Sequence, residues 1–376
     1  MNLKLKLKER LNEFKNQNQV DKMIEGLKTY GSDKLAKELP SLKNPIFICT
    51  IATTETSKIP GLTGAGATPE LTKYTPAGDA ELILDGEVKC MTDIPQTIIG
   101  EVVTPTPSMI TKGSLALCDC PVMVLDAGSE IKANSDVFDI SDGKHGKDIR
   151  SGKAVEDPEG LFEKGFELAE ILSEKHDYIV IGESLPAGTT TALGVLVGLG
   201  YDAKGKVSGC MDTNPHEMKN AIVEEGLKNA GLEESKENNP FDVVRAVGDP
   251  MLPAVAGVLM GAKVPVVLAG GTQLTAACAI AKALDPDFDF SNSCLATTAF
   301  VVKDNTADML NIVEQIGDIA VNAVDPNFEI SRIEGLKNYT QGFIKEGAGA
   351  GGAMFLALML GNSIDEIRES IEDACS

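Results

Sequence analysis

The sequence predicts an α/β fold, a three-layer α/β/α structure with a mostly parallel, Rossmann-like sheet. Three observations predict it. From residue 45 onward, short runs rich in β-forming residues alternate with longer helical patterns. Several of the runs end in turns of glycine and threonine that open a helix. The chain has 376 residues, 43% of them hydrophobic, which is ample for a large core covered on both faces.

Each element follows from the residues in its own stretch. Residues 5–40 place apolar side chains at roughly helical spacing with charged residues between them, and predict helix. Strands are expected over 46–51, 122–125, 178–181, 264–268 and 295–302. Helices are expected over 158–174, 217–231, 251–261, 272–284, 305–316 and 363–374.

These elements suggest three segments. Residues 1–40 form an N-terminal helical segment, and residues 41–334 form the α/β domain, which we expect to carry the ligand-binding turns. Residues 335–376 carry a glycine-rich motif and a charged amphipathic last helix. We expect this C-terminal segment to pack with the N-terminal helices as a small helical lobe.

Charge and cysteine usage exclude several classes of function. The net charge of −22 argues against non-specific binding of nucleic acid, which needs a basic surface. The three histidines and eight cysteines share no metal-ligand spacing, so neither a metal nor a cofactor is expected. Buried free thiols in a reducing cytoplasm are the preferred interpretation of the cysteines.

No targeting or membrane segment is expected. The first ten residues are charged and lack an apolar core behind them, unlike a signal peptide. The most apolar stretch, 264–281, contains Gly270-Gly271 in its middle and predicts a strand, a turn and a helix. We therefore expect a cytoplasmic protein.

The run 345–353, Lys-Glu-Gly-Ala-Gly-Ala-Gly-Gly-Ala, is the most informative stretch. It places the carboxylate of Glu346 directly before Gly347 and Gly349, ahead of a buried helix. Such a turn leaves backbone amides open to a ligand, and partial burial raises a carboxyl pKa toward the range of a general base. The alternative is a glycine-rich helix start with a charged cap.

Three further turns follow predicted strands, where ligands bind in open α/β sheets. After 177–181 come Glu183 and the run Gly188-Thr189-Thr190-Thr191, whose hydroxyls and amides at a helix N-terminus suit an anion such as phosphate. A helix cap is the alternative, because threonine is a good N-cap residue. The turn 207–215 precedes a helix carrying Lys219, whose ammonium group is suited to balancing a phosphate. The turn at Gly270 and Gly271 allows close approach to the backbone.

Other motifs give weaker signals. A basic segment over 144–153 is interpreted as a solvated loop, with steering of a phosphorylated ligand as the alternative. The spacing of Gly347, Gly349 and Gly352 fits G-x-G-x-x-G, but it lies near the C-terminus and lacks the acidic residue expected about 20 residues later. The sequence contains no Walker loop and suggests no Ser-His-Asp arrangement.

Together these turns resemble the nicotinate-nucleotide–dimethylbenzimidazole phosphoribosyltransferase family, in its archaeal branch of formerly uncharacterised proteins. Glu346-Gly347-Ala348-Gly349-Ala350 resembles the family's Glu-Gly-Thr-Gly-Ala motif. Gly182-Glu183 with the threonine run resembles its Gly-Glu-Met-Gly-Ile-x-Asn-Thr-Thr segment, and 266–277 resembles its Asp-Gly-Phe turn followed by Thr-Ala-Ala. The resemblance covers about residues 45–360.

The sequence departs from the family pattern in the phosphate-binding turns. The threonine run here is Gly188-Thr189-Thr190, with one extra residue and no preceding asparagine. The Asp-Gly-Phe turn is replaced by Ala269-Gly270-Gly271, and a glycine-rich nest is replaced by residues 208–212. Phosphate and base contacts carry over less directly than Glu346 does.

The resemblance implies a reaction. The phosphoribosyl group of β-nicotinate mononucleotide would move onto a benzimidazole-type base, giving an α-ribotide phosphate for the lower ligand of a cobamide. Glu346 would be the general base, so Glu346→Gln is expected to lower turnover by about two orders of magnitude. The amides near Gly188, Gly270 and Gly347 with Lys219 would hold ribose and phosphate, and Glu183 would orient a ribose hydroxyl or support Glu346. The resemblance also implies a homodimer.

Three alternatives stay open. The first is a regulatory protein that holds a nucleotide on the same fold without transferring it. The second is the same transfer to another acceptor, such as adenine, a hydroxylated benzimidazole or a phenol. The third is a dehydrogenase, which the missing acidic residue of a second strand disfavours.

Overall fold

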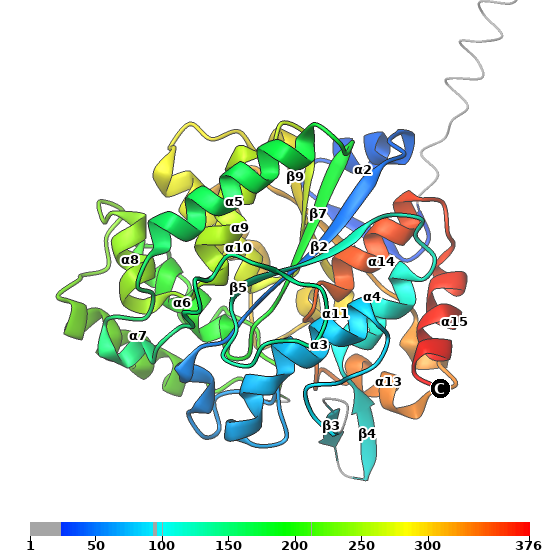
Figure 1. The fold of residues 1–376 in the computed structure, drawn as a ribbon, viewed down its shortest axis with the longest axis horizontal. Helices are drawn as coiled ribbons and strands as arrows, with labels where there is room; N and C mark the ends of the chain where they lie inside the picture. Colours follow the sequence, from blue (N-terminus) through cyan, green and yellow to red (C-terminus); the bar gives the residue numbers. More distant parts are fainter. Residues whose placement is uncertain (1–23, 93–95, 100, 212) are drawn as a thin grey trace, which may run out of the picture.

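The computed structural model describes residues 24–92, 96–99, 101–211 and 213–376 (Figure 1). Their main sheet has eight strands in the order β1-β10-β9-β8-β7-β2-β5-β6. All neighbours are parallel except β1, which is antiparallel to β10. The strands are β1 (Leu27–Tyr30), β2 (Pro45–Ala52), β5 (Val122–Gly128), β6 (Phe138–Asp139), β7 (Tyr178–Ser184), β8 (Val266–Ala269), β9 (Ser293–Thr298) and β10 (Ala320–Val324).

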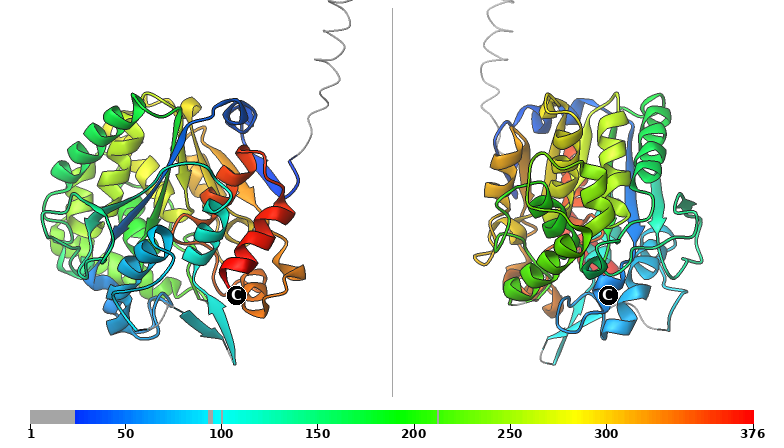
Figure 2. Two further views of the ribbon diagram at one scale, coloured as in Figure 1. Left: turned by 45° about the vertical axis from the view of Figure 1, so that its right-hand side comes forward. Right: turned by 90° about the vertical axis from the view of Figure 1, so that its left-hand side faces the viewer.

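Helices cover both faces of this sheet, which confirms the predicted α/β fold (Figures 1 and 2). One face carries α5 (Pro158–Ser173), α6 (Gly188–Gly198), α7 (His216–Ala230), α8 (Pro240–Val247), α9 (Met251–Gly261), α10 (Thr272–Leu284) and α12 (Met309–Ile316). The other carries α2 (Lys34–Glu38), α3 (Thr75–Leu84), α4 (Pro107–Leu115), α11 (Ala299–Val302), α13 (Glu334–Thr340), α14 (Ala350–Met359) and α15 (Ile364–Ala374).

Strand residues alternate between the two cores. In β2, Ile46 and Ile48 join the core under α5 and α9, whereas Phe47 and Cys49 join the core under α14. This alternation follows from the two-residue period of a strand. Every residue of β2 and β7 is buried, as expected of central parallel strands covered on both faces.

The helical expectation for residues 5–40 is wrong at Leu27–Tyr30. These residues form β1, bounded by Gly26 and Gly31 at φ +76° and +82°. Both glycines adopt a left-handed conformation that interrupts a helix, and the segment instead forms the edge strand of the sheet, paired with β10. Residues 1–23 lie outside the described residues, and the division at residues 40 and 334 stays a prediction.

Two other boundaries differ from the expectation. The strand expected over 295–302 ends at Thr298, and the chain then turns into α11. The turn 207–215 was expected after a strand, but the residues just before it form turns. Strand β10 and the small β3–β4 hairpin (Gln96–Ile99 and Val102–Pro105), which projects from the body in Figures 1 and 2, were not expected from the sequence.

The C-terminal segment is part of the layer on one face of the sheet. Helix α14 packs across β7, β8, β9 and β10, and α15 packs against α4. Within the described residues, no helix is both long and apolar enough to cross a membrane.

The order of the strands places a crevice between the loops that follow β2 and β7. From β2 the chain continues to β5 and β6 on one side, and it returns to β7 on the other side of β2. The loops that leave the carboxyl ends of β2 and β7 therefore diverge. Open α/β sheets bind ligands at such a switch point.

Candidate functional site

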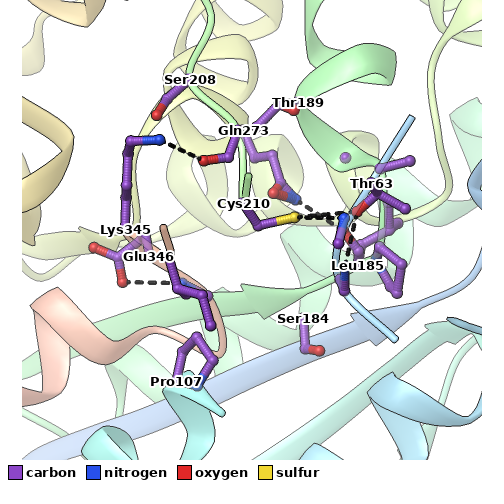
Figure 3. A pocket seen from close by; sticks show the side chains of 18 of the residues that line it. Thr63, Pro107, Ser184, Leu185, Thr189, Ser208, Cys210, Gln273, Lys345 and Glu346 are labelled. Atoms are coloured by element: carbon purple, nitrogen blue, oxygen red, sulfur yellow. Dashed lines mark hydrogen bonds between the residues drawn. The ribbon is translucent and has the colours of Figure 1, made fainter. Parts of the chain in front are cut away.

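A pocket lies at this switch point, beyond the carboxyl ends of β2, β7, β8 and β9. It holds about 1090 Å³ of space free of protein atoms, including the part open to solvent. Five loop segments line it: 62–66, 183–189, 208–211, 271–273 and 344–348. In Figure 3, Lys345 and Glu346 lie on one side, Thr63 and Leu185 on the other, and Cys210 between them.

Glu346 stands between α13 and α14, and its carboxylate ties the start of α14 to the end of β9. Oε2 accepts hydrogen bonds from the Thr297 hydroxyl and the Thr298 amide, both at 2.8 Å. Oε1 accepts them from the amides of Gly351 at 2.9 Å and Gly347 at 3.3 Å. The carboxylate thus caps the free amides at the helix N-terminus.

Glu183 stands in β7, one residue before the strand ends, and its side chain is buried. Oε2 accepts hydrogen bonds from the Leu185 amide at 3.1 Å and from Nε2 of Gln273 at 2.9 Å. Oε1 accepts none from the described residues. Glu183 therefore keeps one carboxylate oxygen free at the pocket.

The two glutamates differ in their electrostatic surroundings. Burial raises the pKa of Glu346, and its four hydrogen-bond donors oppose that rise. Burial raises the pKa of Glu183 well above its ordinary value, and the negative charges of Glu346, Asp249 and Asp79 raise it further. Such pairs of carboxyls with separated pKa values are typical of acid–base sites.

Lys219, in the first turn of α7, is a buried ammonium group in the wall of the pocket. Its Nζ donates to the Thr189 hydroxyl at 3.0 Å and to the Ser208 carbonyl at 2.9 Å. No carboxylate lies within 4 Å of it in the described part of the chain. Burial lowers its pKa to about 8, and the nearby positive charge of Lys345 also lowers it.

Lys345 is a second buried ammonium group, which the sequence analysis did not single out. Its Nζ donates to the carbonyls of Gly209 at 3.1 Å and Met211 at 3.2 Å, and pairs with Asp304 at 3.4 Å. The available signal was its place directly before Glu346, in an otherwise uncharged run. Lys345 ties the loop 208–211 to the segment that carries Glu346.

The glycines before and within α14 make room for the sheet. A Cβ on Gly182 would lie 2.7 Å from the Cα of Gly349, and one on Gly352 would lie 2.6 Å from the Cα of Ala269. A Cβ on Gly351 would overlap Thr297. Glycine here allows close helix–strand packing, which the sequence analysis interpreted as close approach to a ligand.

The predicted site residues divide between the pocket surface and the wall behind it. The residues that line the pocket are Glu183, Gly188, Thr189, Gly271, Glu346 and Gly347. Those that lie behind its surface are Thr190, Lys219, Gly270 and Gly349. Gly188 also makes room for Gln273, whose side-chain amide a Cβ at this position would overlap.

Asp79 is a third buried carboxyl at the pocket, and the sequence analysis missed it. It lies in α3 and accepts hydrogen bonds from the hydroxyls of Ser184 at 2.7 Å and Thr106 at 3.2 Å. Burial raises its pKa, and these hydroxyls, with that of Ser108, oppose the rise. No sequence motif marks it, because its partners come from distant segments.

The glycine-containing loop at 62–66 lines the pocket and was not predicted as part of the site from the sequence. It contacts the opposite wall through Cys210, whose sulfur lies 3.1 Å from the Thr63 hydroxyl and 3.3 Å from the Gly64 amide. The signal was the Gly64-Ala65-Gly66 run after the first strand of the sheet core. These contacts link the loops that follow β2 and precede α7.

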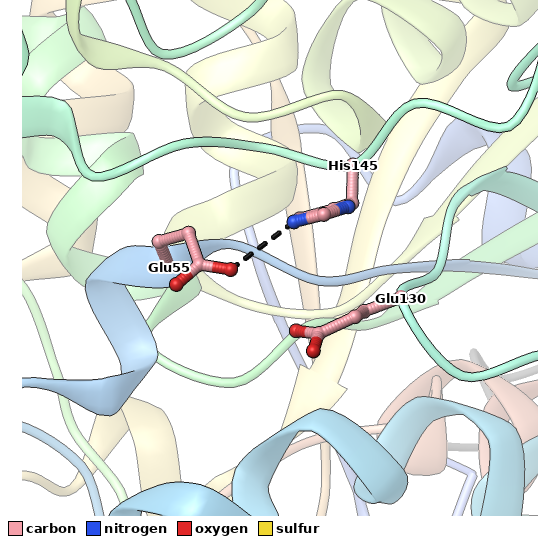
Figure 4. A group of neighbouring side chains, drawn as sticks. All are labelled: Glu55, Glu130 and His145. Atoms are coloured by element: carbon pink, nitrogen blue, oxygen red, sulfur yellow. Dashed lines mark hydrogen bonds and ion pairs between the residues drawn. The ribbon is translucent and has the colours of Figure 1, made fainter.

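A separate group lies beyond the ends of β2 and β5 and consists of Glu55, Glu130 and His145 (Figure 4). Their ligand atoms lie within 4.8 Å of one another, a spacing that suits a metal ion. The Nζ of Lys58, however, lies 2.8 Å from both Glu55 and Glu130. The protein itself thus supplies the cation between these carboxylates.

The basic segment 144–153 is largely matched by acids. Lys144 pairs with Glu156, Arg150 with Asp148, and His145 lies 3.1 Å from Glu55. None of the residues in this segment lines the pocket. Its charges are therefore those of a solvated loop, as the sequence analysis preferred.

Comparison with known proteins identifies the family. Residues 115–298 match the model of a family described as "Phosphoribosyltransferase". A UPF0284 protein of Methanothermobacter thermautotrophicus is 51% identical over 355 residues, 94% of this chain and 98% of the relative. The chain belongs to the UPF0284 family. Another UPF0284 protein, from Methanosarcina acetivorans, is 43% identical over 89% of this chain and 95% of its own length.

Solved structures share the fold of this UPF0284 protein. The crystal structure of nicotinate-nucleotide–dimethylbenzimidazole phosphoribosyltransferase from Thermus thermophilus has a TM-score of 0.54 and 18% identity, covering 86% of this chain and 85% of that one. A structure of CobT from the same organism has a TM-score of 0.52 and 17% identity, covering 88% and 84%. Together with the match to the phosphoribosyltransferase family, these findings confirm the resemblance that the sequence predicted.

Proposed function

We propose that this UPF0284 protein transfers the 5-phosphoribosyl group of β-nicotinate mononucleotide to a benzimidazole-type base and forms an α-ribotide phosphate. The observation that carries the proposal is the pocket at the switch point. Three buried or half-buried carboxyls line it, and behind its surface lies Lys219, a buried ammonium group without a paired carboxylate that donates to the pocket residue Thr189. The phosphoribosyltransferase family match supports the same class of reaction.

The phosphate end of the substrate would lie against Thr189 and Lys219. A buried ammonium group with no carboxylate partner attracts an anion, because the anion supplies the missing charge. Thr189 lies in the first turn of α6, an 11-residue helix whose N-terminus faces the pocket. Helix N-termini favour phosphate through their free amides.

The acceptor base would lie among the apolar side chains of the same pocket. These include Leu62, Pro107, Leu185, Val301 and Ile344. A flat aromatic ring gains free energy there by leaving water. Met211 lines the same pocket.

The chemistry needs positioning and one proton transfer. The pyridinium ring of the nucleotide is already a good leaving group, so the residues present suffice without a metal in the proposed scheme. The acceptor must lose one ring proton as its other nitrogen attacks ribose C1′. Carboxyls with raised pKa values at the pocket are suited to receive that proton.

The test is incubation of the purified protein with β-nicotinate mononucleotide and a panel of acceptors: benzimidazoles, phenols and adenine. Mass spectrometry should detect a new ribotide phosphate and an equal amount of nicotinate. A product with only adenine or a phenol would establish the transfer and change the acceptor. Nucleotide binding without any product would replace the proposal with the regulatory-protein alternative.

The assembly proposed from the family resemblance is a homodimer. Sedimentation equilibrium of the full chain tests it directly, and a mass of about one chain, 39.7 kDa, would contradict it.

A further inference from the structure

The proposed transfer requires a group that takes one proton from the acceptor base. A general base needs a lone pair that is not already occupied and lies within hydrogen-bond reach of the proton. Three carboxyls line the pocket: Asp79, Glu183 and Glu346. Their hydrogen bonds distinguish which of them has such a lone pair.

The carboxylate of Glu346 has no vacant position for a further proton donor. A carboxylate offers about four lone-pair sites on its two oxygens. Four donors occupy them: the Thr297 hydroxyl and three backbone amides. These donors belong to β9, to the turn at Gly347 and to the first turn of α14, so they cannot move aside without disturbing the helix start.

Asp79 is also committed to the protein. Its two oxygens accept hydrogen bonds from Ser184 and Thr106, and Ser108 is a third hydroxyl partner. These contacts join α3 to the start of α4 and to the end of β7. Asp79 therefore has a structural role at the base of the pocket.

Glu183 has the free oxygen. Both of its donors, the Leu185 amide and Nε2 of Gln273, bond to Oε2. Oε1 accepts no hydrogen bond from the described residues and lies 3.9 Å from the position that a Cβ on Gly270 would take. Glu183 is among the residues that line the pocket, so this oxygen is available to a ligand there.

We infer that Oε1 of Glu183 accepts the acceptor's proton, and that Glu346 acts as a positioning residue whose fixed negative charge lies beside it. The inference rests on the proposed function. One ring nitrogen of the acceptor donates its electron pair to ribose C1′. The bond from C1′ to the pyridinium nitrogen breaks, and its electron pair neutralises that nitrogen as nicotinate leaves. The second acceptor nitrogen gives its proton to Oε1, so no other reactant is needed.

The electrostatics support this division of roles. The charged groups that act on Glu183 are Asp79 of α3, Asp249 before α9 and Glu346 before α14, and all three raise its pKa together with burial. A positively charged pyridinium ring in the pocket opposes that rise and favours the ionised form of Glu183 while the substrate is bound. When the ring leaves with a neutral nitrogen, this opposition ends, and Glu183 holds the newly received proton more strongly.

The experiment compares Glu183→Gln with Glu346→Gln in the full chain, at saturating nucleotide, across pH 5 to 9. We expect Glu183→Gln to lower kcat about 100-fold and to abolish the rise of kcat with pH, while the KM for the nucleotide stays within a few fold. Glu346→Gln keeps the rise with pH and lowers Tm, because the glutamine amide opposes a backbone N–H. Glu372→Gln is the control variant. Glu372 is a buried carboxyl of α15, far along the chain, that accepts a hydrogen bond from the Arg332 amide.

A second readout uses the acidity of the acceptor. A nitrobenzimidazole has a more acidic ring N–H, so its transfer depends less on a general base. It should therefore restore much of the activity of Glu183→Gln. It should not restore the activity of a variant in which the substrate is misplaced. If Glu183→Gln does not fold, Glu183→Asp keeps the carboxyl and should retain the pH profile at a lower kcat.

The outcomes are distinct. A pH profile that is lost in Glu346→Gln and kept in Glu183→Gln would overturn the inference and return the base to Glu346. A wild-type protein that makes no ribotide with any acceptor would overturn the proposed function itself, before any variant is compared.

Discussion

The turn at the end of β7 and the turn at the start of α14 look alike in sequence but differ in what their residues do. Each places a glutamate and nearby glycines directly ahead of a helix. At α14, the glutamate is saturated with hydrogen bonds and the glycines fit against β7, β8 and β9. At β7, Glu183 keeps a free oxygen at the pocket. A conspicuous glycine run can therefore mark tight packing, while the open chemistry lies at the plainer turn.

The largest effect on nucleotide binding is expected for Lys219→Met, a substitution in the wall behind the turn that follows β7. The variant removes the charge proposed to hold phosphate, and charge-assisted hydrogen bonds contribute about 1.5–3 kcal/mol each. We expect the KM for β-nicotinate mononucleotide to rise about 100-fold, measured by initial rates.

Stability provides the control for this variant. The pKa of Lys219 is lowered in the folded protein to about 8, so its charged form costs free energy of folding at pH 7. Removing that charge should leave the free energy of unfolding unchanged or raise it, as measured with urea. A large fall in stability together with an unchanged KM would contradict the proposed phosphate contact.

The next effect concerns packing at α14. In Gly352→Ala, the added Cβ would lie 2.6 Å from the Cα of Ala269 and push the helix away from β8. Overpacking of this kind costs about 1–3 kcal/mol, more than the gain in helix propensity of roughly 0.5–1 kcal/mol. Chemical denaturation should show the loss. An unchanged midpoint would mean that these glycines serve a ligand instead of the sheet.

Gly188→Ala tests the other turn, and its effect should fall on activity. The atoms nearest to the added Cβ would be those of the Gln273 side-chain amide, which can rotate away, but Gln273 would then lose its hydrogen bond to Glu183. Since one such bond to a charged group contributes about 1.5 kcal/mol, we expect kcat to fall roughly tenfold. Stability should change little, because alanine favours the helix. Equal losses of stability in both glycine variants would erase the contrast between the two turns.

The sequence predicted the sheet core better than its edges, for a physical reason. Buried central strands such as β2 and β7 are marked by their own apolar residues, whereas β1 forms because two glycines and pairing with β10 override a helical spacing. In the site, the glycine-rich run before a predicted helix pointed to Glu346, and a turn after a predicted strand pointed to Glu183. Asp79 and Lys345 were missed because the partners that make them part of the pocket are distant in sequence.

The smallest predicted effect is a dependence of nucleotide binding on pH. Because the pKa of Lys219 is about 8 in the free protein, its ammonium group is present below pH 8 and is lost as the pH rises above it. A bound phosphate stabilises the charged form and raises this pKa, so the Kd should increase about fourfold by pH 8.5. Isothermal titration calorimetry between pH 7 and 9 measures it. Lys219→Arg keeps its charge throughout this range, so its Kd should not change with pH even if binding is weaker. A wild-type Kd that stays constant to pH 9 would place the phosphate away from Lys219. The turn after β7 would then have no role in phosphate binding, and Glu183 alone would connect it to catalysis.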